Sequence, residues 1–249
     1  MIRRYKKKYI ALIAVFVVII AAIVFFVQFT SIGFRMTVPL RSFTEAVPNV
    51  YIHEGFTRDM TEVLHIVGVA KRRVAEYFKE TKSIPIIIIC DDAKTIKKLG
   101  GDHDIKTLVF FKVYSYIVVS SEYLNVDIVA HEMTHAEVYY RIFKGKICYQ
   151  SLISTWFDEG LALQNDYRED YNEDAWQEAT DNGKNVIDLN EINTAAKFYA
   201  EELEERKYRY IVSKHELNGW VERNGVDVLI DLLDKVNQGK KFNDLYFAK

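Results

Sequence analysis

The stretch VDIVAHEMTHAEVYYRIF, residues 126–143, sets two histidines into an apolar pattern of helical spacing. The pattern predicts a helix, on which positions i and i+4 share one face, so the imidazoles of His131 and His135 can reach one metal ion. Glu132 follows the first histidine and can address a water molecule on that ion. A solvated helix face explains the motif poorly, because the histidines have apolar neighbours and buried polar groups need partners.

A second motif offers a third ligand. Catalytic zinc takes three protein ligands and leaves a fourth position open. The segment TWFDEGLA, residues 155–162, is a second predicted helix with two carboxylates, Asp158 and Glu159, followed by small residues that allow another helix to approach. The two carboxylates point about 100° apart on a helix, so one of them is expected to be the ligand. The three-histidine arrangement H-E-x-x-H-x-x-G-x-x-H is excluded, because no H-x-x-G-x-x-H continuation follows His135.

These two motifs together resemble the gluzincin metallopeptidases, in particular the small bacterial domains described as peptidase MA-like. In that family an H-E-x-x-H helix is followed by the pattern W-x-x-E-G-L-A. The residues that match it position by position are Trp156, Glu159, Gly160, Leu161 and Ala162. The resemblance implies an α+β, thermolysin-like catalytic domain with a small sheet and a helical C-terminal half.

The resemblance also implies roles for the site residues. His131, His135 and Glu159 would bind one Zn²⁺, and Glu132 would be the general base. The family pattern favours Glu159 over Asp158 as the third ligand. Position 163, one turn after Glu159, is leucine where some gluzincins have a carboxylate that orients a zinc histidine, so the sequence leaves this orienting partner unassigned.

A later helix carries a further candidate. The family pattern there starts with Tyr-x-x-Ser and continues into a short Leu-rich helix. The matching residues are Tyr210, Ser213, Leu217, Trp220, Val221, Gly225, Val228, Leu229, Leu232 and Leu233. The resemblance implies that Tyr210 stabilises the developing oxyanion. A core or rim position for Tyr210 is the alternative, and Tyr208 is a competing candidate. His215 is either a second donor or an ordinary surface histidine.

Other polar positions receive structural interpretations. The acidic stretch from Asp166 to Asp181 is either a solvated surface loop with a helix start or a lid over the substrate. Trp156 is interpreted as a core anchor. The histidines without ligand spacing are His53, His65 and His103.

The N-terminus predicts a membrane anchor. Residues 9–29 carry no charge and are long enough for a hydrocarbon thickness of about 30 Å. A cleaved signal peptide is the alternative, but its apolar core would be shorter and end in small residues. The basic tail, residues 1–8, precedes the anchor, so the N-terminus is expected in the cytoplasm and the remainder outside it. Residues 30–48, with two of the three prolines, are expected to form a stalk.

The remaining pattern predicts an α+β domain over residues 49–249, with strands first and helices later. Strands are expected near residues 50–53 and 85–90, with a strand or hairpin over 108–120. Helices are expected over residues 58–79, 126–143, 154–166, 192–223 with a possible break, and 226–237.

Composition limits the partners. The five Lys and Arg residues before the anchor leave the rest of the chain more acidic than the net charge of −2 suggests. A nucleic-acid partner is therefore not expected. Cys90 and Cys148 match no metal or redox spacing, and we interpret them as buried free thiols, with a single bridge as the alternative.

The sequence thus predicts a membrane-anchored, extracytoplasmic zinc peptidase that acts on peptides or proteins. A zinc-holding regulatory module without activity is a second hypothesis, against which the intact Glu132 argues. A zinc hydrolase of a non-peptide amide is a third, because cleft shape, not the metal, selects the substrate.

Overall fold

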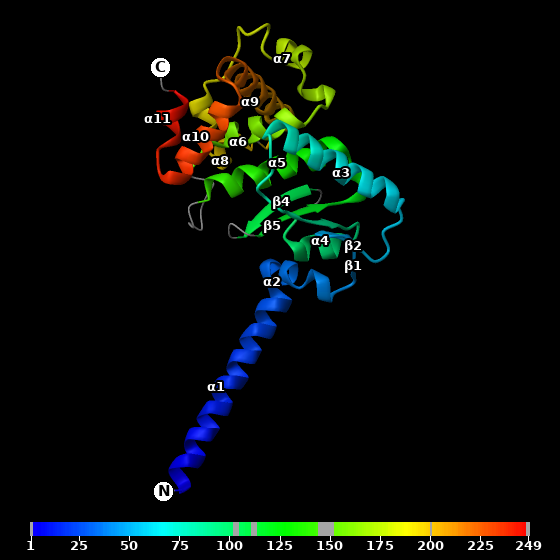
Figure 1. Ribbon diagram of the computed structural model, residues 1–249, viewed down its shortest axis with the longest axis vertical. Coiled ribbons are helices and arrows are strands. Elements are labelled where there is room, and N and C mark those ends of the chain that lie inside the picture. Colours follow the sequence, from blue (N-terminus) through cyan, green and yellow to red (C-terminus); the bar gives the residue numbers. More distant parts are fainter. Residues whose placement is uncertain (1, 102–104, 111–113, 144–151, 200, 248–249) are drawn as a thin grey trace.

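The computed structural model describes residues 2–101, 105–110, 114–143, 152–199 and 201–247. One long helix, α1 (Ile2–Phe29), projects away from a body built of a twisted sheet and helices (Figure 1). The C-terminus lies at the end of the body that is remote from α1. Helix α1 therefore lies apart from the body, and the body holds both sequence motifs.

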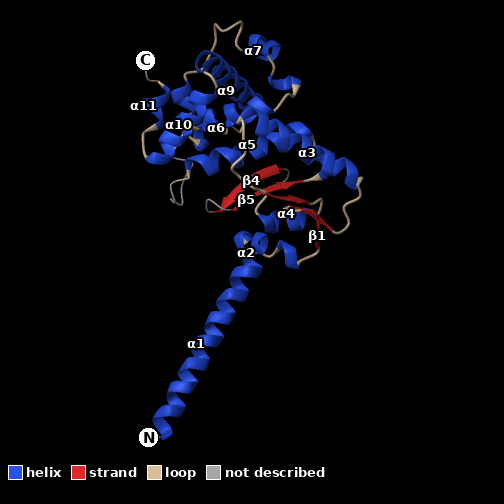
Figure 2. Ribbon diagram, in the orientation of Figure 1, coloured by secondary structure: helices blue, strands red, loops and turns tan. Residues whose placement is uncertain are grey.

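The described residues form a five-stranded sheet in the order β1-β2-β3-β5-β4, drawn in red in Figure 2. Strands β2, β3 and β5 run parallel, while the edge strands β1 and β4 are antiparallel to their neighbours. Their bounds are β1 (Phe43–Val47), β2 (Val50–His53), β3 (Ile86–Ile89), β4 (Ile105–Phe110) and β5 (Tyr114–Val119). The all-isoleucine β3 is buried on both faces, as a central parallel strand requires.

The two faces of the sheet are covered by different helices. On one face, Ile88 packs with Phe34 of α2 (Ser31–Met36) and Leu99 of α4 (Ala93–Leu99). On the other face, Ile87 and Ile89 belong to the main core with α3 (Met60–Tyr77) and α5 (Val126–Ile142). Because successive side chains of a strand point to opposite faces, the isoleucine run serves both layers at once.

The C-terminal half is helical and packs around α5. Its α-helices are α6 (Thr155–Ala162), α7 (Glu173–Ala179), α8 (Ala195–Phe198), α9 (Leu203–Asn224), α10 (Val226–Gln238) and α11 (Phe242–Tyr246). The 3₁₀ helices of the described residues are η1 (Val38–Leu40), η2 (Ser121–Tyr123), η3 (Leu163–Asn165), η4 (Glu169–Tyr171) and η5 (Leu189–Ile192). Trp156 is buried against the ring of Tyr246, 5.2 Å between centroids, which confirms its interpretation as a core anchor.

Gly160 brings α6 and α9 together. A Cβ atom at this position would lie 2.4 Å from the carbonyl oxygen of Ser213 on α9, closer than real Cβ atoms come. Only a residue without a side chain fits there. The small residues after Glu159 therefore allow the close helix approach that the sequence predicts.

Most of the expected elements are present in this mixed α and β body. Strands β2 and β3 and helices α3, α5, α6 and α10 lie where the sequence predicts them. The expected hairpin is β4 and β5, of which residues 111–113 lie outside the described residues. The long helix expected over residues 192–223 is divided into α8 and α9, and α4 was not predicted.

The segment expected to be a stalk is folded onto the domain. Residues 31–47 form α2, η1 and β1, and β1 pairs with β2. Phe34 and Val38 are buried against the sheet. This burial offsets the conformational entropy that the segment loses when it is ordered. The domain therefore begins directly after α1.

Within α1, residues 12–29 form one helix long and apolar enough to cross a membrane, and none of that window is buried in the body. A signal sequence would pass the same test. Cys90 is buried and free, as interpreted from the sequence, while Cys148 lies outside the described residues.

Candidate metal centre

Helix α5 holds the two histidines in a fixed relation. It begins after Asn125, whose side-chain oxygen accepts a hydrogen bond of 2.9 Å from the N–H of Ile128 and so caps the helix. His131 and His135 lie one turn apart on the same face, and their ring centroids are 4.9 Å apart. Both rings are buried.

Helix α6 brings Glu159 to the two rings. The Nε2 atoms of His131 and His135 are 3.2 Å apart, and each lies 3.4 Å from Oε2 of Glu159. Ligand atoms around a tetrahedral ion with bonds of about 2.0–2.1 Å are separated by about 3.3–3.4 Å. The three side chains therefore have the spacing of one face of a tetrahedral site, and they form a group that can hold a metal ion.

The hydrogen bonding of Glu159 supports this fit. Among the described residues, its Oε2 is buried and has no hydrogen-bond partner. A buried carboxylate oxygen without a partner is costly, and a bound cation removes that cost. Two imidazole nitrogens and one carboxylate oxygen suit several divalent metals, so these donors fit a metal without identifying which one.

Asp158 orients His135. Its Oδ1 lies 3.0 Å from Nδ1 of the imidazole, and its Oδ2 accepts a hydrogen bond of 2.6 Å from the hydroxyl of Tyr139. A carboxylate at Nδ1 fixes the ring so that Nε2 faces the metal position. The alternative ligand of the sequence analysis thus contacts the far nitrogen of a histidine.

Asp166 has the corresponding place beside His131. Its Oδ2 lies 3.6 Å from Nδ1 of His131, and the carboxylate also accepts hydrogen bonds from the guanidinium of Arg168. Asp166 is completely buried, and its backbone carbonyl accepts a hydrogen bond of 2.7 Å from Lys214 on α9. Leu163, at the position where some gluzincins carry an orienting carboxylate, is a buried core residue. In this chain Asp158 and Asp166 are the carboxylates that lie beside the histidines.

The charges of these carboxylates shape the ionisation of the site. Burial is the largest influence on each imidazole and by itself lowers its pKa. Asp158 and Glu159 nevertheless keep the pKa of His135 well above its usual value, and Asp166 and Glu159 raise that of His131. Burial acts to raise the pKa of Glu159, but the two histidines lower it below its usual value. The negative charge of these carboxylates therefore favours a bound cation at the site.

Tyr199 contacts the third ligand. Its hydroxyl donates a short hydrogen bond to Oε1 of Glu159 from the end of α8. Burial of the hydroxyl and then the negative charge of Glu159 raise the pKa of Tyr199, so the phenol keeps its proton and remains a donor. One oxygen of Glu159 is thus held by Tyr199, while the other faces the histidines.

Tyr210 lies near the same site on α9. Its ring contacts those of Phe198 and Tyr171, at centroid distances of 5.1 and 6.0 Å. Burial raises its pKa well above the usual value, and the nearby carboxylates of Glu159 and Glu132 raise it further. The hydroxyl is therefore protonated and within electrostatic reach of the metal ligand and of the residue expected to act as base.

The other candidates have structural contacts. Tyr208 accepts a hydrogen bond from the N–H of Ile187 and donates one to the carbonyl of Asn185. His215 stacks on Trp176 at 3.7 Å, and its Nδ1 lies 3.2 Å from Glu173, so it joins α9 to α7. These contacts agree with the surface interpretation of His215.

The acidic stretch has two parts with different roles. Its first residue, Asp166, belongs to the metal centre. Most of the rest forms η4 and α7, which pack on α9. The side chains of these two helices are largely exposed. The expectation of a solvated loop and helix start is confirmed for this part, whereas Asp166 was missed.

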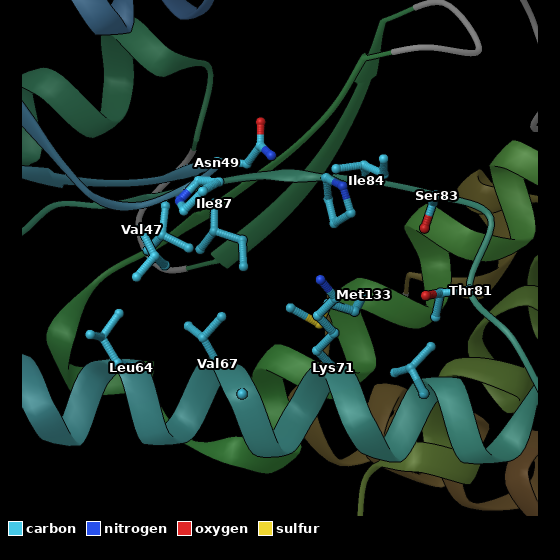
Figure 3. A pocket seen from close by; sticks show the side chains of 15 residues that line it. Val47, Asn49, Leu64, Val67, Lys71, Thr81, Ser83, Ile84, Ile87 and Met133 are labelled. Carbon is cyan, nitrogen blue, oxygen red and sulfur yellow. The ribbon is translucent and has the colours of Figure 1, made fainter.

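A separate cavity lies behind the histidine helix. It has a volume of about 230 Å³ and is lined by side chains of α3, by residues 47–50 at the turn between β1 and β2, and by residues 81–87, which lead into β3 (Figure 3). Most of the lining is apolar, and Lys71 is a charged exception. Met133 of α5 lines it, whereas His131, His135 and Glu159 do not. This cavity is therefore distinct from the metal centre.

Comparison with known proteins gives no relative for this chain. No family model matches it, and neither the curated proteins nor the solved structures compared with it contain a match.

Proposed function

We propose that this chain is a membrane-anchored zinc metallopeptidase whose metal ligands are His131, His135 and Glu159. The observation that carries the proposal is the convergence of these three groups, in which Oε2 of Glu159 has no hydrogen-bond partner among the described residues. Glu132 lies on the same helix as the two histidines. The donor set of two histidines and one glutamate is one that catalytic zinc uses. The resemblance of the two motifs to gluzincins supports the same assignment.

The chemistry divides between the metal and the chain. When bound, zinc would polarise a carbonyl group and lower the pKa of a water molecule to about 7. Glu132 neighbours a ligand but is absent from the metal-binding group, and it is only half-buried. It is suited to accept a proton from the attacking water and then deliver it to the leaving amine.

Tyr210 is the proposed oxyanion donor. Its raised pKa keeps the hydroxyl protonated, which is the state that can donate a hydrogen bond to negative charge developing on the substrate. Tyr208 is not suited to this role, because its hydroxyl is already bonded to the backbone of residues 185 and 187.

The edge of the sheet is a surface along which an extended peptide substrate can bind. Strand β4 is an outer strand of the described sheet, and it lies in contact with α5. An edge strand presents backbone N–H and C=O groups that an extended peptide can pair with. A substrate bound in this way would lie alongside the helix that carries Glu132.

Replacing Glu132 with glutamine tests the proposal. The full chain and the Glu132→Gln variant are loaded with zinc and incubated with a broad peptide library. We expect equal zinc content and folding, with hydrolysis lowered by about 10²–10⁴-fold. Tyr210→Phe should lower turnover by about 10²–10³-fold at unchanged zinc content. Tyr208→Phe is the matched control and should retain activity.

Two outcomes would contradict the proposal. A Glu132→Gln variant as active as the parent would remove the general base. A parent chain that binds zinc tightly and cleaves nothing in the library would favour the regulatory module, or a hydrolase of non-peptide amides if such substrates are turned over.

Retention of α1 as an anchor is part of the proposal. The guanidinium of Arg41 donates a hydrogen bond of 2.9 Å to the carbonyl of Val27 in the last turn of α1, so the body contacts the end of the helix itself. Cleavage after Val27 would remove this contact. The basic tail predicts a cytoplasmic N-terminus. Protease added to intact cells should digest the domain, and digestion only after permeabilisation would reverse the orientation.

A further inference from the structure

The junction between α1 and the body is a compact corner. Helix α1 ends at Phe29 and α2 begins at Ser31, with only Thr30 between them. The Thr30 hydroxyl donates a hydrogen bond of 2.6 Å to the carbonyl of Phe26 and accepts one of 3.0 Å from the N–H of Gly33. A Cβ atom on Gly33 would lie 2.3 Å from that same carbonyl. The corner therefore tolerates little change of angle between α1 and α2.

Helix α4 is joined to the same corner. The Arg35 side chain of α2 is buried and donates a hydrogen bond of 2.5 Å to the carbonyl of Leu99. Gly100, which ends α4, lies so close to Ser31 that an added Cβ would be 3.2 Å from the serine Cβ. The C-terminal end of α4 thus abuts the first residue of α2.

The surface around this corner combines apolar and basic side chains. Leu40 and Met36 are 86% and 50% exposed. Arg41 lies over the ring of Phe34 at 3.9 Å, and the ammonium of Lys98 lies 5.7 Å from the same ring. Lys97 is also exposed at this end of α4. We name Met36, Leu40, Arg41, Lys97 and Lys98 the juxtamembrane face.

Among the described residues, the acidic groups next in sequence to α4 lie at its other end. Asp92 precedes the helix and caps it through hydrogen bonds from Thr95, and Asp91 accepts a hydrogen bond from the N–H of Ser121. Both are therefore engaged away from the end that abuts α2. The positive charge of α4 is concentrated beside α1.

We propose that the juxtamembrane face docks on the phosphate groups of an anionic bilayer, with Leu40 and Met36 entering the interface and Arg41, Lys97 and Lys98 pairing with the phosphates. The proposal rests on the anchoring of the chain by α1. If α1 spans the bilayer, a corner that starts one residue later must lie at the headgroups. Exposed apolar side chains flanked by cations are the chemistry that such an interface binds.

Docking fixes which side of the domain faces the membrane. Helices α2 and α4 cover the face of the sheet nearest α1, while α5 and α6 lie on its opposite side (Figure 1). The sheet then stands between the bilayer and the group of His131, His135 and Glu159. The proposed site is therefore turned towards solution, where it meets soluble or loosely attached chains and not the membrane interior.

The test uses the full chain in lipid nanodiscs and the fluorescence of an added tryptophan. Leu40→Trp places the probe on the juxtamembrane face, and Leu203→Trp is the matched control on α9, at a residue that is 72% exposed. The nanodiscs contain lipids brominated near the headgroup, which quench only nearby rings. We expect quenching of the tryptophan at position 40, stronger with anionic than with zwitterionic lipid, and none at position 203.

A double charge reversal tests the basic side chains. In the Leu40→Trp background, Lys97→Glu with Lys98→Glu should lower the quenching several-fold, whereas Lys240→Glu with Lys241→Glu should leave it unchanged. Equal quenching with zwitterionic lipid would overturn the requirement for an anionic bilayer. An unquenched tryptophan at position 40 in chains that stay in the nanodisc would overturn docking but not anchoring. Chains that fail to enter nanodiscs would overturn both, and zinc-dependent hydrolysis by the same samples is scored separately.

Discussion

The Nδ1 atom of His135 lies 3.0 Å from Oδ1 of Asp158, the residue that immediately precedes the proposed ligand Glu159. Two adjacent carboxylates on α6 thus reach opposite nitrogens of one imidazole. The turn of about 100° per helical residue makes this possible, because it directs the two side chains to different places. The carboxylate on Nε2 is suited to bind the metal, and the carboxylate on Nδ1 is suited to orient the ring.

Variants of this pair should affect metal binding unequally. Glu159→Gln removes a charged ligand, so the chain should no longer retain zinc during gel filtration. Asp158→Asn keeps the ligand set and should weaken zinc affinity by about 10–100-fold. Affinity is measured by competition with a chromogenic chelator, and Asp174→Asn on exposed α7 is the control. Equal losses from both site variants would remove the ligand assignment.

Loss of the Tyr199 hydroxyl should also weaken the metal site. The hydrogen bond to Oε1 holds Glu159 in place, and a bond to a charged group contributes about 1.5–3 kcal/mol. Tyr199→Phe should therefore lower zinc affinity by at least about tenfold. Tyr208→Phe removes a hydroxyl that bonds only to backbone groups among the described residues, so it should leave affinity unchanged. A Tyr199→Phe chain with parental affinity would contradict the role of this bond.

Zinc binding should release protons at neutral pH. In the metal-free fold the pKa of His135 is well above its usual value of about 6.5, and that of His131 is also raised. At neutral pH, protons then occupy the imidazole nitrogens that would bind the metal. Zinc affinity should therefore increase as pH rises through the raised pKa values of the two histidines. The lowered pKa of Glu159 means that it contributes no proton. Calorimetry at pH 7 in two buffers of different ionisation enthalpy should give different heats, and equal heats would contradict the prediction.

Gly160→Ala should destabilise the fold. The added methyl group would lie 2.4 Å from the Ser213 carbonyl, which forces α6 and α9 apart at a cost of about 1–3 kcal/mol. Gly68→Ala on α3 is the control, since nothing lies within 4 Å of its added Cβ and alanine favours helices by about 0.5–1 kcal/mol. Urea denaturation should thus shift the two midpoints in opposite directions. A neutral Gly160→Ala would show that the helices separate freely.

The metal group was the most predictable part of the site. His131 and His135 are fixed by helical spacing alone, and the motif around Glu159 is short enough to be read locally. Asp166 and Tyr199 were missed because their roles depend on chain paths after α6, which no local spacing encodes. Arg168 was a signal for Asp166, because a basic residue two positions away can stabilise a buried carboxylate.

The fold was predictable where periodicity is long. Helices α3 and α5 are long amphipathic patterns, and β3 is a solid apolar run. The segment after α1 was misjudged because its helix has only six residues, too few to show a period. Its prolines suggested a linker, whereas the burial of Phe34 and Val38 is a tertiary effect. The strand order was likewise inaccessible, since parallel pairing joins residues that are distant in sequence.

The bond between Tyr199 and Glu159 joins residues 40 positions apart, and it sets the order in which the centre can mature. Because synthesis starts at the N-terminus, the histidine helix is made first, then Glu159, and the tyrosine last. A nascent chain that ends before α8 holds the three ligands without the group that fixes one of them. On the proposed function, full metal affinity would be reached only after α8 has been made, when the proposed anchor α1 has long been synthesised.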